Sequence, residues 1–136
     1  MSPVKPEIRR IDPPALGTPP SYSQVVEAVG SAFIFISGQT AFDDAGNVVS
    51  GDDCGAQATQ AFRNLGHALA AVGCTGANLV KLTVFLRQMD DLAKYRAARD
   101  DFFTAAGVKP PAVTLVEVSR LYAPELLIEI EAIAVR

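Results

Sequence analysis

The segment that most constrains the fold is residues 126–135, LLIEIEAIAV, near the end of the chain. Its apolar residues alternate strictly, and a period of two predicts a β-strand with two distinct faces. One face is entirely apolar and consists of Ile128, Ile130, Ala132 and Ala134. The other face places Glu129 and Glu131 among aliphatic side chains. We therefore expect the first face to lie in the core and the second to meet another protein subunit, because subunit interfaces mix apolar and polar groups in this way.

Composition favours a soluble, self-associating domain. Hydrophobic residues make up 49% of the 136 residues, and the mean hydropathy is +0.22. No apolar run approaches the length of a membrane span, and the first residues lack the apolar stretch of a signal peptide. A net charge of −3 without any cluster of Lys and Arg argues against a nucleic-acid partner.

The cysteines and the histidine predict no metal centre. Cys54, Cys74 and the single His67 do not have metal-ligand spacing, and His67 lies off the apolar stripe of its predicted helix. The two isolated thiols are typical of small buried residues in a reducing compartment, so we expect a cytoplasmic protein.

The chain divides into an arm and one domain. Six of the nine prolines fall in residues 1–20, which predicts an extended N-terminal arm without regular structure before a domain over residues 21–136. Two strands are expected next, over residues 22–28 and 32–37 and joined by a turn at 29–31. A tight turn at 43–47 leads into a short strand at 48–49.

Two helices follow. Apolar spacing predicts the first from about residue 54 to 72, capped by Asp52 or Asp53 and stopped at Gly73, and the second from about residue 90. Further strands are expected at 79–87 and 112–119. This order predicts an α+β fold in which both helices pack on one face of a mixed sheet, leaving Glu129 and Glu131 on the other.

Six blocks in sequence order resemble the Rid (YjgF) family of reactive intermediate deaminases, and they span nearly all of the chain beyond the arm. The blocks are YSQ at 22–24, ISGQ at 36–39, QAFRNL at 60–65, VKLTVFL at 80–86, VEVSRL at 116–121 and IEIEAIAV at 128–135. The resemblance implies a chorismate-mutase-like fold and a homotrimer whose sheets line a central barrel. It also implies cofactor-free hydrolysis of small imines and enamines, in clefts between subunits, to carbonyl compounds and ammonia.

The resemblance also implies roles for individual residues. Glu129 would orient the attacking water, Tyr22 would close the cleft and hydrogen-bond the substrate, and Ser37 and Gly38 would shape the pocket wall with the backbone after Pro111. Glu131 would instead have a structural partner. Tyr22 has an alternative interpretation as an aromatic residue of the subunit interface.

The chain departs from the family pattern where active members read Pro-Ala-Arg-Ser. It reads Pro-Ala-Val-Thr, so Val113 replaces the arginine that would bind a substrate carboxylate, and Leu115 replaces a small residue. By alternation both side chains share one face, which predicts an aliphatic pocket wall. Arg96 either supplies the missing charge from its helix or pairs with Asp100 one turn later.

Three functions follow from these observations. The first is a deaminase with altered substrate preference, and the second is a trimeric protein that binds a small molecule or regulates without turnover. The third is the ribonuclease of older family labels, which the acidic balance of the chain favours least.

Overall fold

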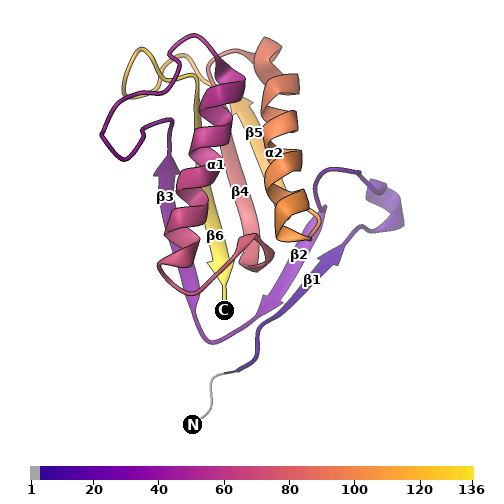
Figure 1. Ribbon diagram of the computed structural model, residues 1–136. Helices are drawn as coiled ribbons and strands as arrows, with labels where there is room; N and C mark the ends of the chain where they lie inside the picture. Colours follow the sequence, from indigo (N-terminus) through magenta and orange to yellow (C-terminus); the bar gives the residue numbers. More distant parts are fainter. Residues whose placement is uncertain (1–3) are drawn as a thin grey trace.

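The computed structural model describes residues 4–136 and shows two helices covering one face of a four-stranded sheet, with a separate two-stranded ribbon at one end (Figure 1). The strands are β1 (Glu7–Ile11), β2 (Val25–Val29), β3 (Phe33–Gln39), β4 (Leu79–Leu86), β5 (Ala112–Glu117) and β6 (Ile128–Val135). The helices are α1 (Cys54–Ala70) and α2 (Leu92–Ala106). The predicted α+β class, with both helices on one face, is confirmed.

The main sheet has the order β3-β6-β4-β5 and is mixed, as predicted. Strand β6 is antiparallel to both β3 and β4, whereas β4 and β5 are parallel. A parallel pair needs a long crossover connection, and α2 provides it. The sheet edges are therefore β3 and β5, with the apolar strand β6 in the interior.

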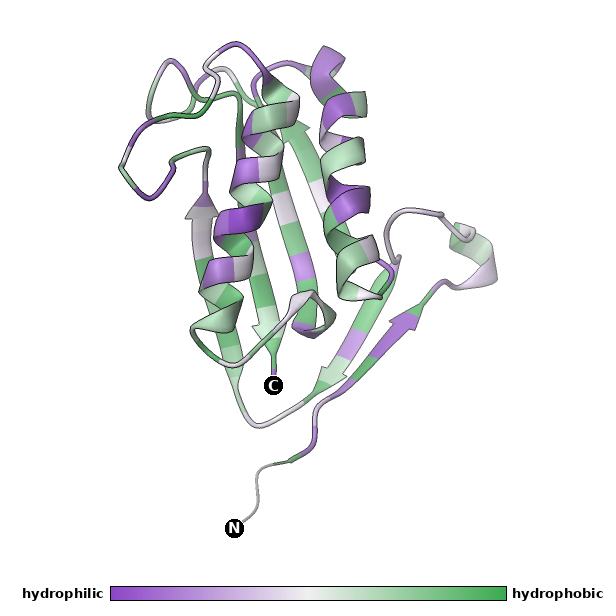
Figure 2. Ribbon diagram, viewed as in Figure 1, coloured by the Kyte–Doolittle hydropathy of each residue, from purple (hydrophilic) through white to green (hydrophobic). Residues whose placement is uncertain are grey.

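The core lies between α1, α2 and the helix-facing side of the sheet (Figure 2). Ile128, Ile130, Ala132 and Ala134 of β6 are at most 3% exposed, which confirms the predicted core face. They meet the apolar stripe of α1, whose buried members include Ala58, Phe62, Leu65 and Leu69. Asp53 caps the N-terminus of α1, because its carboxylate accepts a hydrogen bond from the N–H of Ala56 at 3.2 Å.

The N-terminal segment differs from expectation. Of the arm predicted to lack regular structure, residues 1–3 lie outside the described residues, but Glu7–Ile11 form strand β1 and Pro14–Leu16 a short 3-10 turn. Strand β1 pairs with β2, and its Arg10 side chain donates to the Lys109 carbonyl at 3.1 Å. Backbone pairing and this anchor order a segment that its proline content alone predicted to be irregular.

The two strands expected over residues 22–28 and 32–37 both form within three residues of the expected bounds, but they do not pair with each other. Strand β2 pairs with β1, while β3 pairs with β6. The connection instead bonds to the C-terminal residue, because Ser31 and Ala32 both donate to the Arg136 carbonyl at 2.7 and 2.8 Å. Neither strand therefore pairs with its neighbour across the turn.

The segment between β3 and α1 contains the predicted turn but not the predicted strand. Asp43 and Gly46 close the turn at 43–47, and Gly46 adopts a positive φ of 81°. Residues 48–49 make only an isolated bridge, between Val48 and Phe42.

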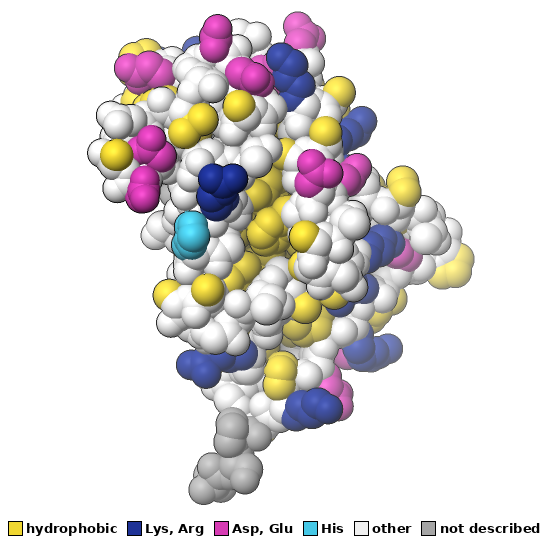
Figure 3. Space-filling model, viewed as in Figure 1, with side chains coloured by type: hydrophobic (Ala, Val, Ile, Leu, Met, Phe, Trp, Pro, Cys, Tyr) yellow, Lys and Arg dark blue, Asp and Glu magenta, His cyan; other side chains and the backbone are white. Residues whose placement is uncertain are grey.

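The helix-covered face carries scattered charges around an apolar strip between α1 and α2 (Figure 3). Within residues 4–136, no helix has both the length and the apolar character needed to cross a membrane.

The close approach of Gly30 to the C-terminus provides a test of this connection. A methyl group at position 30 would lie 2.5 Å from Val135 Cγ1 and 2.8 Å from the Arg136 carbonyl oxygen. We expect Gly30→Ala to lower the free energy of unfolding by about 1–3 kcal/mol, the usual cost of overpacking. Urea unfolding should show little change for Gly51→Ala, whose new methyl group meets only Glu125 Cβ at 3.6 Å. Equal stability of the two variants would contradict this assignment.

Candidate active site

The face of the sheet opposite the helices is rich in exposed aromatic and aliphatic groups. Phe33 and Phe35 of β3 are 65% and 76% exposed, and Val116 of β5 is 41% exposed. Phe35 pairs with Ile133 in β6, so these groups continue across strands. Large exposed apolar patches of this kind mark sites of protein association. This open face is the one that carries Glu129.

Glu129 lies against the backbone of β3. Its register partner in β4 is Phe85, and its carboxylate packs so closely on Gly38 that a methyl group at position 38 would overlap Oε1. The β3–β6 register shifts between Ile36 and Gln39, which is where Gly38 lies. The structure therefore brings together Ser37, Gly38 and Glu129, which the sequence had proposed for one site.

The environment of Glu129 favours its protonated form. Burial raises the pKa of this carboxyl above its ordinary value, and the nearby charge of Glu131 raises it further. Glu131 itself is exposed and pairs in register with Thr83. Glu131 makes no hydrogen bond or ion pair with residues 4–136, so the structural partner expected for it is not found among them.

A second group of predicted residues lies on the helix side of the sheet. Val113 and Leu115 pair in register with the core residues Leu82 and Val84, so they point toward α2. They line a cavity of about 300 Å³ together with Ser21, Tyr22, Met89, Leu92, Tyr95, Arg96 and Arg99. The predicted aliphatic wall is present in this cavity.

Tyr22 reaches this cavity because the next residue fixes the chain beside β5. Ser23 is buried, its N–H donates to the Pro111 carbonyl at 3.0 Å, and its hydroxyl donates to the Pro110 carbonyl at 2.9 Å. The backbone near Pro111 therefore positions Tyr22, whose side chain remains 37% exposed.

The arginines of α2 do not pair as expected. Arg96 is exposed and makes no hydrogen bond or ion pair with residues 4–136, so one of the two alternatives for it, a pair with Asp100, is not formed. Asp100 instead accepts two hydrogen bonds from Arg99, at 2.9 and 3.0 Å. Arg99 was not predicted from the sequence to belong to the site; the available signal was a charged residue four positions after Tyr95, and so on the same side of the helix.

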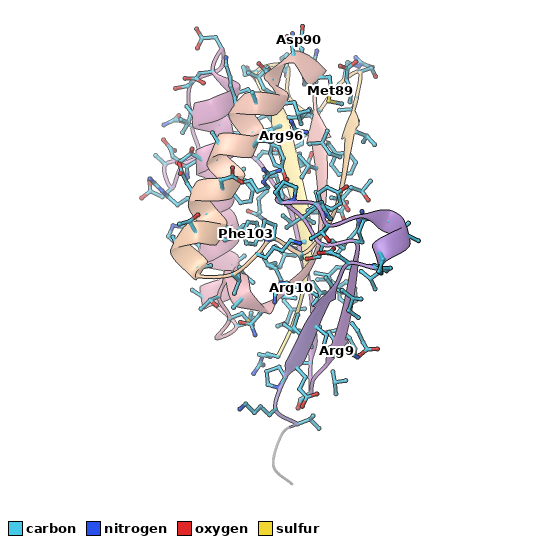
Figure 4. The ribbon with its side chains drawn as sticks, turned by 90° about the vertical axis from the view of Figure 1, so that its right-hand side faces the viewer. Arg9, Arg10, Met89, Asp90, Arg96 and Phe103 are labelled. Atoms are coloured by element: carbon cyan, nitrogen blue, oxygen red, sulfur yellow. The ribbon has the colours of Figure 1, made fainter. Side chains whose placement is uncertain are left out.

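The two groups cannot meet within one chain. Glu129, Ser37 and Gly38 lie on the open face, whereas Tyr22, Arg96, Val113 and Leu115 lie beyond the β5 edge on the helix side. Figure 4 shows Arg96 midway along α2, between Met89 at one end and Phe103 toward the other, on the side where residues 17–24 approach. A site that uses both groups needs a second copy of the chain.

The cysteines and His67 lie away from both groups. Cys54 and Cys74 are buried, as predicted, and burial raises the pKa of the Cys54 thiol to about 12. No cluster of three or more His, Cys, Asp or Glu side chains suited to a metal occurs among the described residues.

Comparison with known proteins matches this arrangement to one family. The family model described as endoribonuclease L-PSP matches residues 14–136. The fold resembles that of a Rid family protein of unknown function from Yersinia pestis, with a TM-score of 0.87 and 34% identity over 95% of this chain and 98% of that one. This chain belongs to the Rid family.

Curated Rid relatives include proteins with a named activity. A protein of Salmonella typhimurium named 2-iminobutanoate/2-iminopropanoate deaminase is 39% identical over 124 residues, which are 91% of each chain. A RutC family protein of Synechocystis is 39% identical over 115 residues, covering 84% of this chain and 85% of the relative.

The raised pKa of Glu129 predicts a pH-dependent stability. The folded protein holds the Glu129 proton more tightly than the unfolded chain, so ionisation costs stability as the pH rises above the ordinary value of 4.5. Glu129→Gln should therefore raise the melting temperature at neutral pH and leave it unchanged in acid well below that value. Glu131→Gln, which removes only the neighbouring charge, should give a smaller rise. A lower melting temperature for Glu129→Gln at neutral pH would contradict the argument.

Proposed function

We propose that this protein hydrolyses a small reactive imine or enamine to a carbonyl compound and ammonia, without a cofactor, in a cleft between two subunits of a homotrimer. The observation that carries the proposal is the half-buried carboxylate of Glu129, held against Gly38 on an open apolar sheet face. Relatives named for the deamination of 2-iminobutanoate and 2-iminopropanoate support the reaction class.

The chemistry requires one group that moves protons. Water attacks the electrophilic carbon of the protonated imine while Glu129 accepts a proton from that water. Glu129 then returns the proton to the nitrogen of the carbinolamine. As ammonia leaves, the ionised Glu129 accepts the hydroxyl proton and the C=O bond forms; this proton departs with the ammonia as ammonium, which restores the carboxylate. A carboxyl whose pKa is raised toward neutral is better suited to both steps than an ordinary one.

A neighbouring subunit would complete the cleft. The exposed Phe33 and Phe35 give the open face an apolar surface of the kind that subunits bury. Packing this face near the β5 edge of a second copy would bring the second copy's aliphatic wall, Val113 and Leu115, toward Glu129. Tyr22 would then close the cleft from the second copy's side.

Val113 changes the expected substrate preference. A substrate carboxylate placed against Val113 and Leu115 without a counter-charge would be costly to bury. Two arginines of α2, Arg96 and Arg99, line the same cavity and supply positive charge from another element. The substrate is therefore expected to sit differently from one held by an arginine at position 113.

The alternative is a trimer that binds a small molecule without turning it over, which the aliphatic wall also accommodates. Ribonuclease activity, named in the description of the family model, has less support, because the net charge of −3 gives no basic track for an RNA backbone.

Ammonia release from freshly generated 2-imino acids tests the reaction. We expect wild-type protein to accelerate release and Glu129→Gln to lose about 10²–10⁴-fold, the usual contribution of a general acid–base group. Glu131→Gln serves as the matched control and should retain most of the rate. No acceleration by wild type, together with saturable binding of the 2-oxo acids, would favour the binding protein instead.

Mixed assembly tests whether the site is shared. Glu129→Gln and Val113→Glu should each abolish turnover while leaving the trimer intact by sedimentation. Trimers assembled from an equal mixture should regain about one quarter of wild-type activity. A cleft is intact only when one subunit supplies the native Glu129 and its neighbour the native Val113, and each of these has a chance of about one half. No recovery in verified mixed trimers would show that each site is built within one chain.

A further inference from the structure

Arg99 is the buried arginine of the cavity that Val113 and Leu115 line. Its side chain is only 7% exposed, in contrast to the exposed Arg96 one turn earlier on α2. Guanidinium groups are seldom buried unless they are paired or bind a ligand. Its partner Asp100 accepts only some of the hydrogen bonds that the guanidinium can donate.

That partner holds the guanidinium in one orientation. Nε and Nη2 of Arg99 donate to the same oxygen, Oδ1 of Asp100, at 3.0 and 2.9 Å. The Cζ atom lies 5.6 Å from the centre of the Tyr95 ring. One edge and one face of the group are thus occupied, while Nη1 makes no hydrogen bond to any residue from 4 to 136. A planar group held in this way is preorganised to bind a carboxylate with its remaining donors.

A second polar group at the same cavity also lacks a partner. The Tyr95 hydroxyl belongs to a side chain that is 1% exposed; the Arg99 guanidinium lies near it, but no group among residues 4–136 makes a hydrogen bond of good geometry with it. Buried polar groups are nearly always satisfied, so an orphaned hydroxyl beside a cavity indicates a ligand or water that completes it. Burial raises the pKa of this phenol to about 12, so it stays a neutral hydrogen-bond donor.

The charges around the cavity favour an anion. Its lining contains Arg96 and Arg99 and no acid. The lining of the adjoining groove, of about 870 Å³, also contains Asp100 and Lys109. Asp100 forms the ion pair with Arg99, and Lys109 pairs with Asp12 at 2.7 Å. Asp100 balances one of the two arginine charges, so the cavity and its groove keep a net positive charge, and the rest of the cavity lining is largely aliphatic or aromatic.

We propose that Arg99 binds the carboxylate of the substrate, taking the place of the arginine that the family pattern puts at position 113. The Tyr95 hydroxyl donates to the same carboxylate, and the wall formed by Val113, Leu115 and Leu92 receives an aliphatic side chain. The substrate class is a 2-imino acid with an apolar side chain. This assignment rests on the proposed function, of which it specifies the substrate.

Calorimetric binding of the corresponding product, 4-methyl-2-oxopentanoate, and of its neutral amide tests the assignment without requiring turnover. Wild type should bind the acid more tightly than the amide. Arg99→Gln should weaken binding of the acid by about ten- to a hundredfold, the scale of a charge-assisted hydrogen bond, and leave the amide nearly unchanged. The matched control Lys94→Gln, which removes an exposed charge of the same helix outside the cavity lining, should change acid binding less than about threefold, because an exposed charge is screened.

A second measurement keeps the test decisive if Arg99→Gln fails to fold. Titrating wild type with the acid should shift the Nε–Hε resonance of Arg99, and the amide should not. Failure of the acid to move that resonance, or equal losses in Lys94→Gln and Arg99→Gln, would overturn the assignment. Arg99-dependent binding of the acid by a protein that releases no ammonia from imines would instead uphold the carboxylate site and refute the deaminase proposal.

Discussion

The position of β6 between β3 and β4 organises the rest of the structure. A buried strand must pair its backbone on both edges, and β6 does so while its apolar side packs on α1. With Ile128 and Ile130 in the core, the intervening Glu129 must point to the open face, since neighbouring side chains alternate. A slip of one residue would bury both acids, so the apolar residues of β6 determine where the candidate catalytic carboxylate lies.

The same alternation separates the site into two halves. Val113 and Leu115 pair with core residues of β4, so their side chains lie on the helix side of the edge strand β5. Glu129 lies on the opposite face of the sheet, in the interior strand β6. No rotation of side chains brings the halves together, because a continuous hydrogen-bonded sheet lies between them. The proposed shared cleft therefore requires association of copies, which would also bury the exposed aromatic residues of β3.

The positive charge near the pocket comes from a helix and not from strand β5. Strand β5 carries Val113 where the family pattern has an arginine, and α2 contributes Arg99 to the lining of the same cavity. Helical spacing places Arg99 on the same side of α2 as Tyr95, and both are buried. The spacing pointed to Asp100 as a partner of Arg96, whereas Asp100 binds the adjacent Arg99. Neighbouring side chains on a helix diverge, so only the packed environment reveals that this pair forms.

The sequence by itself determined the type and approximate bounds of both helices and of the main-sheet strands, the core face of β6 and the aliphatic character of the wall at Val113 and Leu115. Periodicity reports these features because it records which side of an element is apolar. Only the tertiary structure decided that β2 pairs with β1, that Gly38 lies against Glu129, and that Arg99 is the buried arginine. Those outcomes depend on which strand edges meet and on how close two backbones come, and these are contacts between residues far apart in the chain that no local pattern encodes.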